Sequence, residues 1–274
     1  IVYEIRLEQA LAEDLLCPFH YFGISDLWID GKEINLEEDN ISFSNLSEGE
    51  RVDKIIEKIR YFGHSGSRVK GLVFCSNKKE AKELSDAFNL RKFRTISLTG
   101  DDSQAKREDA IARLTGTGAY QGFVDDQLDY IFTVDIFNEG VDIPEVNQVI
   151  MLRQTESPIV FIQQLGRGLR KFEDKEYVVI LDFIGNYSNS YMIPLALSGD
   201  RSYNKDTLRK YVQSGNRIIP GTSTVHFDSI AKKRIFAAID TANLSSAKLI
   251  KEAYLDLKYK LGHICLLYTS DAAD

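Results

Sequence analysis

The stretch Val69-Lys-Gly-Leu-Val-Phe-Cys-Ser-Asn-Lys-Lys-Glu80 decides the fold. Its first seven residues form a mostly apolar run of the length of a buried strand, and Asn77 followed by Glu80 three positions later resembles a helix N-terminus. The helix that this start predicts has one apolar face, made by Ala81, Leu84, Ala87 and Phe88. A buried strand followed at once by an amphipathic helix is typical of an α/β protein.

The same alternation continues on both sides of this stretch. Upstream, Ser47 and Glu50 resemble a capping box, and the apolar stripe that follows predicts a helix. Downstream, four more apolar runs predict strands, at residues 95–98, 130–134, 146–152 and 177–183. Helices are predicted to start at Ser103 and at Ser157-Pro158. Because these runs are continuous rather than alternating, we expect a parallel sheet wrapped by helices.

The composition is that of an ordinary globular protein. The 274 residues are 43% hydrophobic and 27% charged. Three scattered cysteines are too few for a disulfide framework or a cysteine-based metal cluster. No apolar run approaches the roughly 20 residues of a membrane-spanning helix, and the first residues lack the pattern of a signal peptide. We therefore expect a soluble, cytoplasmic protein.

The charge is unevenly distributed along the chain. The net charge is −7, but residues 188–262 hold 12 Lys and Arg against 6 Asp and Glu. Lys and Arg dominate sequence-independent affinity for nucleic acids, so this region predicts a basic surface that meets phosphate. An ordinary solvated face explains the same excess equally well.

The strongest chemical signal is Gln163-Gln-Leu-Gly-Arg-Gly-Leu-Arg170. On a helix, Gln163, Arg167 and Arg170 project from one face, and neither arginine has an acid four residues before it. Two glycines within a helix each cost about 1 kcal/mol relative to Ala, so we expect something to approach this backbone closely. A site of phosphoryl transfer needs such fixed positive charge. An exposed basic helix is the plainer alternative.

A second polar segment, Thr133-Val-Asp-Ile-Phe-Asn-Glu-Gly-Val-Asp-Ile-Pro144, follows the strand predicted at 130–134. In open α/β sheets ligands bind beyond the carboxyl ends of the strands, which is where this loop begins. Its acidic and amide side chains could accept from a ribose hydroxyl or orient an arginine. Taken alone, they are also typical of an ordinary turn.

Together these segments resemble the second motor domain of superfamily 2 DNA and RNA helicases. Residues 69–77 are similar to motif IV, residues 133–144 to motif V, and residues 163–170 to motif VI. The resemblance implies a RecA-like sheet of the P-loop NTPase type, with Arg167 and Arg170 reaching a nucleotide and Arg170 as the arginine finger. It implies further ATP-binding positions at Gln163, Gly140 and Asp142. The implied nucleic-acid-binding positions are Phe74, Ser76, Thr99, Gly100, Thr133 and Asn138.

Flanking segments resemble a bacterial subgroup of these helicases that carries a DUF3427-type C-terminal extension. We accordingly expect residues 1–50 to be the end of a first motor domain and a connector, and residues 51–187 to be the RecA-like domain. Residues 188–262 are expected to begin a basic, mainly helical extension. The last residues resemble a translated sequencing adaptor, so residues 263–274 are expected to be an adaptor-derived or disordered tail.

A Gly-rich phosphate loop ending in Gly-Lys-Ser/Thr does not occur in this sequence, and neither does an acidic strand-end motif for magnesium. ATP with Mg²⁺ is therefore expected to be bound mainly by a missing first motor domain, and this chain alone is expected to be inactive. The expected macromolecular partner is DNA, with RNA left open, and no metal site of the chain's own is expected. The alternatives are a duplex-DNA translocase subunit of a restriction or defence system, and a non-catalytic nucleic-acid-binding module.

Overall fold

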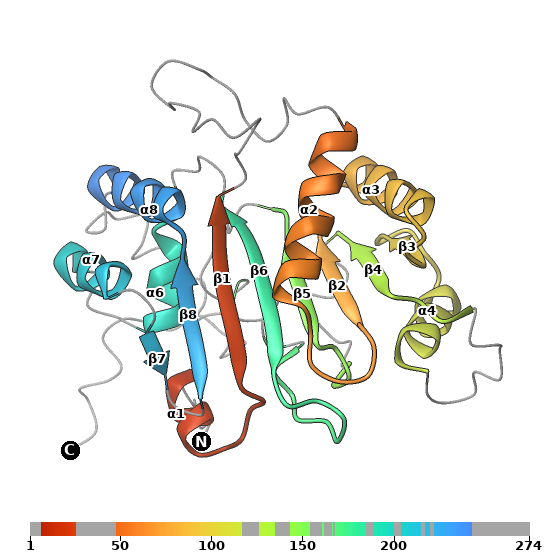
Figure 1. Cartoon of the computed structure of the whole chain (residues 1–274), viewed down its shortest axis with the longest axis horizontal. Helices are drawn as coiled ribbons and strands as arrows, with labels where there is room; N and C mark the ends of the chain where they lie inside the picture. The colour runs from red at the N-terminus through yellow and green to blue at the C-terminus, as the bar shows by residue number, and fades with distance from the viewer. Residues whose placement is uncertain are drawn as a thin grey trace, which may run out of the picture.

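The structure is a computed structural model that describes residues 7–25, 48–116, 126–134, 143–153, 161, 166, 168–184, 189–199, 204–214, 217–219 and 222–242. The strands within these residues form one eight-stranded sheet in the order β3-β4-β2-β5-β6-β1-β8-β7 (Figure 1). Neighbouring strands are parallel, except that β7 is antiparallel to β8 at one edge. Their bounds are β1 Phe19–Ser25, β2 Gly71–Phe74, β3 Thr95–Leu98, β4 Tyr130–Thr133, β5 Gln148–Met151, β6 Val178–Ile184, β7 Arg217–Ile219 and β8 Ser223–Phe227.

Helices pack on both faces of this sheet, and alternate residues of strands β2, β4, β5 and β6 enter two separate cores. In β2, Leu72 and Phe74 lie in the first core and Val73 in the second. Helices α1 (Leu7–Ala12), α4 (Gln104–Thr115), α6 (Met192–Ser198), α7 (Lys205–Gln213) and α8 (Ser229–Thr241) contribute to the first core. Helices α2 (Glu48–Phe62) and α3 (Lys78–Leu90) cover the opposite face. The expected parallel α/β sheet wrapped by helices is confirmed.

Local signals in the sequence predicted the helix starts correctly where the structure describes them. The Asn77 side chain accepts from the Glu80 backbone amide at the start of α3, and the Ser103 side chain accepts from the Lys106 amide at the start of α4. Ser47 and the start predicted at Ser157-Pro158 lie outside the described residues. Each predicted strand exists, although β2, β4 and β5 are shorter than their apolar runs.

The sheet runs across both predicted domain boundaries. β1, from the segment expected to be a connector, pairs along its full length with β6 and also with β8 of the expected extension. A strand at this position satisfies its backbone amides and carbonyls on both sides, which ties the three segments into one folded unit. Within its described residues the extension supplies strands β7 and β8 as well as helices α6, α7 and α8. The predicted tail, residues 263–274, lies outside the described residues.

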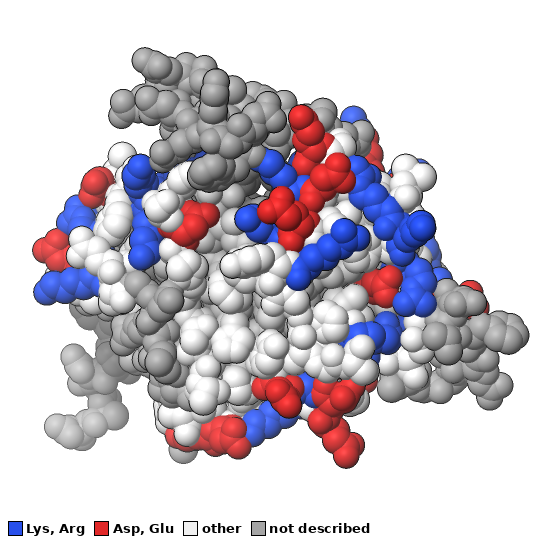
Figure 2. Space-filling model, viewed as in Figure 1, with Lys and Arg blue, Asp and Glu red and all other residues white. Residues whose placement is uncertain are grey.

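The basic excess of the extension is partly neutralised. Arg209 on α7 pairs with Asp206 at 2.8 Å and with Asp240 on α8 at 2.5 Å. Arg234 is only 4% exposed and donates to the Ile184 carbonyl. Figure 2 shows both signs of charge over these helices rather than a uniform basic surface. The described part of the extension therefore favours the ordinary solvated face.

Candidate functional site

The turns after β2, β3 and β4 gather at one edge of the sheet. Because these strands are parallel and adjacent, their carboxyl ends lie together, near the top of Figure 1. Three of the predicted nucleic-acid-binding residues, Ser76, Thr99 and Gly100, belong to these turns and are exposed or half-exposed. The structure thus brings these three predicted residues to one accessible edge, which we call the carboxyl edge.

Side chains from the start of α4 hold the Thr99–Gly100 turn in place. The Asp102 carboxylate accepts from the Thr99 amide at 2.7 Å and from the Thr99 hydroxyl at 3.3 Å. The Arg107 guanidinium donates to the Gly100 carbonyl at 2.8 Å and to the Thr99 carbonyl at 3.3 Å. The hydrogen bond from Lys106 and that from the Thr99 amide lower the pKa of Asp102. Sequence reasoning missed Asp102 and Arg107, although an Asp at the end of a turn is a known signal for such bonding.

Ser76 is held in a similar way at the start of α3. Its backbone amide donates to the Glu80 carboxylate at 2.7 Å, and its hydroxyl lies 3.4 Å from the Leu152 carbonyl beyond β5. Glu80 also forms an ion pair with Arg51 of α2. This edge is therefore a set of polar turns, each fixed by a neighbouring charged side chain.

The structure buries the side chains of two of the predicted nucleic-acid-binding residues. Phe74 and Thr133 are the last residues of β2 and β4, and both are 0% exposed. Phe74 packs in the first core, and the Thr133 hydroxyl is buried without a hydrogen-bond partner. A side chain with no accessible surface cannot touch a bound strand, so only the turns that follow these residues remain candidates.

Five of the predicted site positions cannot be placed. Gly140, Asp142, Asn138, Gln163 and Arg167 all lie outside the described residues. Their roles remain predictions.

The segment that carries Arg170 lies at the opposite edge of the sheet. The Leu169 carbonyl accepts from the Cys17 amide at 2.7 Å, and the Val178 amide donates to the Pro18 carbonyl at 2.9 Å. Cys17 and Pro18 come just before β1, so this segment joins the amino ends of β1 and β6, which we call the amino edge. The Arg170 side chain is exposed there.

The two glycines of this segment differ in the space around them. A Cβ at Gly168 would lie 3.1 Å from Val178 and 3.2 Å from Val149 of the sheet, whereas a Cβ at Gly166 would meet nothing within 4 Å. The close approach predicted for these glycines is therefore made, at Gly168, by the protein's own strands. Gly166 has open space beside it.

Part of the chain is similar to a known protein family. Residues 50–172 match the family model of the helicase conserved C-terminal domain. We call these residues the helicase C-terminal region. The DUF3427-type subgroup and the truncation remain predictions.

The similar proteins are much longer than the part they share with this chain. One relative is IRC3 of Saccharomyces cerevisiae, whose name describes it as an ATP-dependent helicase. It is 25% identical over 206 residues, which are 74% of this chain and 28% of that protein. The mitochondrial irc3 of Schizosaccharomyces pombe, also named for an ATP-dependent helicase, is 29% identical over 173 residues, 58% of this chain and 27% of that protein. The chain thus spans under a third of the length of either relative.

A solved structure shares the fold over nearly the whole chain. The ATP-dependent type ISP restriction-modification enzyme LlaBIII, solved bound to DNA, aligns with a TM-score of 0.54 and 16% identity, covering 94% of this chain and 19% of that one. This likeness concerns the fold, and it supports a RecA-like α/β architecture.

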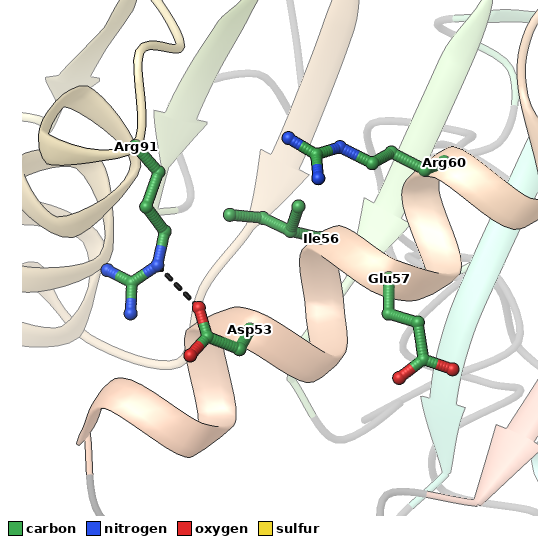
Figure 3. A pocket seen from close by; sticks show the side chains of 5 residues that line it. All are labelled: Asp53, Ile56, Glu57, Arg60 and Arg91. Carbon is green, nitrogen blue, oxygen red and sulfur yellow. Dashed lines mark hydrogen bonds and ion pairs between the residues drawn. The ribbon is translucent and has the colours of Figure 1, made fainter.

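A shallow pocket on the helicase C-terminal region lies between α2 and the end of α3, where Asp53, Ile56, Glu57, Arg60 and Arg91 line it (Figure 3). The Arg91 guanidinium donates to Asp53 at 2.6 Å and to the carbonyls of Gly49 and Ala87. Its donors thus fasten the two helices together, and the acids offset the two arginines. We do not assign a ligand to it.

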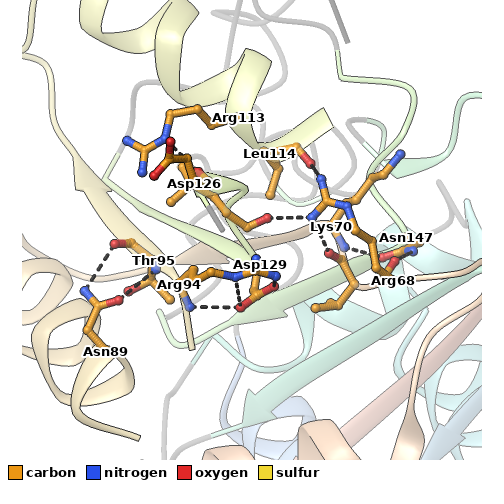
Figure 4. Close-up of polar contacts among 12 residues, drawn as sticks. Arg68, Lys70, Asn89, Arg94, Thr95, Arg113, Leu114, Asp126, Asp129 and Asn147 are labelled. Atoms are coloured by element: carbon orange, nitrogen blue, oxygen red, sulfur yellow. Dashed lines mark hydrogen bonds and ion pairs between the residues drawn. The ribbon is translucent and has the colours of Figure 1, made fainter. Parts of the chain in front are cut away.

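The polar cluster at the amino ends of β2 to β5 is also structural (Figure 4). Arg68 donates to the Leu128 and Leu114 carbonyls, and Arg94 pairs with Asp129 at 2.9 Å. Burial lowers the pKa of Arg68. The donors of these arginines are directed at the protein's own chain, which connects the loops at this end of the helicase C-terminal region.

Cysteine chemistry and a metal centre find no support in the described residues. Cys17 and Cys75 are buried, and burial raises the pKa of both thiols, so both stay protonated at neutral pH. Among the residues that the structure describes, no group of three or more His, Cys, Asp and Glu side chains is placed to hold a metal ion. The described helices include none that is long and apolar enough to cross a membrane.

Proposed function

We propose that this chain supplies the second motor lobe of an ATP-dependent DNA helicase or translocase. The observation that carries the proposal is the exposed Arg170 at the end of the motif VI segment, within residues that match the helicase C-terminal domain. Arg170 is two residues from Gly168, whose packing against β5 and β6 fixes the segment that presents it. A site of phosphoryl transfer uses a guanidinium that a second domain supplies.

In this proposal the two edges have separate tasks. At the amino edge, Arg170 contacts the nucleotide. Four residues outside the described part of the chain are proposed as further nucleotide-binding positions: Arg167, Gln163, Gly140 and Asp142. At the carboxyl edge, the turns at Ser76 and Thr99–Gly100 contact the nucleic-acid backbone. Asn138, outside the described residues, is proposed as a further contact. A first lobe would hold most of the ATP and its Mg²⁺ and would supply the phosphate loop and the magnesium ligands. This chain's part is to orient the nucleotide and balance its charge.

The test uses the longer protein in which a first motor lobe precedes this chain. Arg170→Ala should lower the nucleic-acid-stimulated ATPase kcat by about 10³-fold or more, because a supplied arginine is worth that much in related phosphoryl transfer. Arg91→Ala is the matched control, since Arg91 is an arginine on the same region that pairs with Asp53. An ATPase rate in Arg170→Ala equal to that of the control removes the assignment.

The alternative of a duplex-DNA translocase in a restriction or defence system is favoured by one observation, the shared fold with the type ISP restriction-modification enzyme. A translocase displaces a triplex-forming strand but does not open a forked duplex, whereas a helicase opens the fork. Measuring both with the longer protein separates these two motors.

A non-catalytic binding module would behave differently from either motor. Nucleic-acid affinity would then fall steeply with salt and show no dependence on nucleotide. Binding titrations of the longer protein with and without a non-hydrolysable ATP analogue test this third possibility.

A further inference from the structure

Lys175 is a buried lysine in the turn between the motif VI segment and β6. The residue is 7% exposed. Its ammonium donates to three backbone carbonyls: Val146 at 3.1 Å, Gly168 at 3.0 Å, and Pro144. A buried lysine is uncommon, and burying its charge is costly unless strong acceptors replace water.

Two of the three carbonyls belong to the segments that the proposed function depends on, and the third lies between motif V and β5. Pro144 is the last residue of the motif V segment, and Val146 follows it before β5. Gly168 lies in the motif VI segment, two residues before Arg170. An ammonium has three N–H donors, so three carbonyls can satisfy it completely, and hydrogen bonds from a charged donor are about twice as strong as neutral ones. One cation therefore fastens the end of motif V to the end of motif VI.

Neighbouring contacts make this junction stiff. The Cys17 amide holds the Leu169 carbonyl at 2.7 Å, and Gly168 packs directly on Val178 and Val149. We therefore expect a displacement of the motif VI segment to displace the chain at Pro144 as well, because Lys175 is hydrogen-bonded to both.

We propose that Lys175 is a positioning residue that couples the nucleotide-facing arginine segment to the exit of the motif V loop. The inference rests on the proposed function, because it needs nucleotide to act on the motif VI segment. Lys175 itself touches neither nucleotide nor nucleic acid. Removing the Lys175 side chain should weaken the stimulation of ATP hydrolysis by nucleic acid. It should not abolish ATP hydrolysis or nucleic-acid binding.

The experiment measures, in the longer protein, the ratio of nucleic-acid-stimulated to basal ATPase rate for Lys175→Met. This change keeps the length of the side chain and removes its charge and donors. We expect the ratio to fall by about tenfold, within the range typical of coupling between two sites. A purely structural role would lower both rates together and leave the ratio unchanged.

Lys171→Met is the matched control, because Lys171 lies on the same segment and pairs with Asp14 on the surface at 2.5 Å. Its ratio should equal that of the wild type. A Lys175→Met ratio within about twofold of this control overturns the inference.

A second variant covers a failure to fold, which far-UV circular dichroism and thermal melting would reveal. If Lys175→Met does not fold, Lys175→Gln replaces it, since the amide still donates to carbonyls but carries no charge, and the same loss of ratio is expected. Loss of folding in both variants would make Lys175 a structural residue only and would overturn the inference. Unchanged ATPase in Arg170→Ala would instead overturn the proposed function, so the two failures are distinguishable.

Discussion

The carboxyl edge and the amino edge of the sheet are stabilised by opposite means. At the carboxyl edge, the turns at Thr99–Gly100 and Ser76 are exposed or half-exposed and are held by the side chains of Asp102, Arg107 and Glu80. At the amino edge, the motif VI segment is held by buried contacts of its backbone with Lys175, Cys17 and the strands. Both edges use charged groups, but those at the carboxyl edge lie nearer to solvent, where water competes for their hydrogen bonds. The carboxyl edge is therefore suited to contacts that change as nucleic acid binds. The amino edge is suited to holding the motif VI segment in a fixed position.

Replacing the two motif VI glycines one at a time gives the largest expected effect on stability. Gly168→Ala should lower the free energy of unfolding by about 1–3 kcal/mol, because its Cβ would press on Val178 and Val149 within 3.2 Å. Gly166→Ala should raise it by up to about 1 kcal/mol, since the space is open and Ala favours a helix. Chemical denaturation of both variants of this chain measures the difference. Equal destabilisation by the two changes would show that the amino edge is not packed as described.

Removing the guanidinium of Arg107 tests how firmly the carboxyl edge is held. Arg107→Met loses two bonds to the Thr99 and Gly100 carbonyls, worth about 1 kcal/mol together after exchange with water. Nucleic-acid affinity should fall by about fivefold while the melting temperature changes little, because this edge adjusts rather than unfolds. Fluorescence anisotropy with a labelled oligonucleotide gives the affinity, and Arg113→Met on the same helix is the control. Affinity equal to that of the control would contradict the assigned role of the turn.

Acid should loosen the carboxyl edge before the amino edge. The pKa of Asp102 lies below its ordinary value of 3.8, so its stabilising effect is complete above that pH and is lost as the pH falls through the lowered pKa. Amide exchange at Thr99 should therefore accelerate, relative to the intrinsic rate, in this acidic window. Asp102→Asn should show the faster exchange already at neutral pH. Amide exchange at Val178, which donates to the Pro18 carbonyl, should not follow the same titration.

The smallest effect is expected on the surface of the extension. Arg209 pairs with Asp206 and Asp240 on the surface of the extension. Such exposed pairs contribute little, so Arg209→Met should leave melting temperature and oligonucleotide affinity unchanged within experimental error. A marked loss of affinity would instead support the interpretation of residues 188–262 as a basic surface that binds phosphate.

Much of the fold was predictable because its signals are local. Asn77 and Ser103 cap their helices as their spacing predicts, and the apolar runs at residues 95–98 and 130–134 are strands β3 and β4. The candidate site was predictable only in part. Ser76, Thr99 and Gly100 do lie at an exposed edge, but Phe74 and Thr133 are buried. A position within a motif does not by itself reveal whether the side chain is buried or exposed.

The sequence by itself determined the α/β alternation, the capped helices, and the segments whose residue types point to phosphate. Tertiary structure alone decided that β1 enters the middle of the sheet, since Phe19 pairs with Val178 and His20 with Thr224 across long stretches of chain. It also decided that Gly168 faces two strand valines and that Lys175 meets three carbonyls. The physical reason is range: capping and periodicity act within a few residues, whereas strand order and buried partners depend on contacts that exist only after the chain has folded.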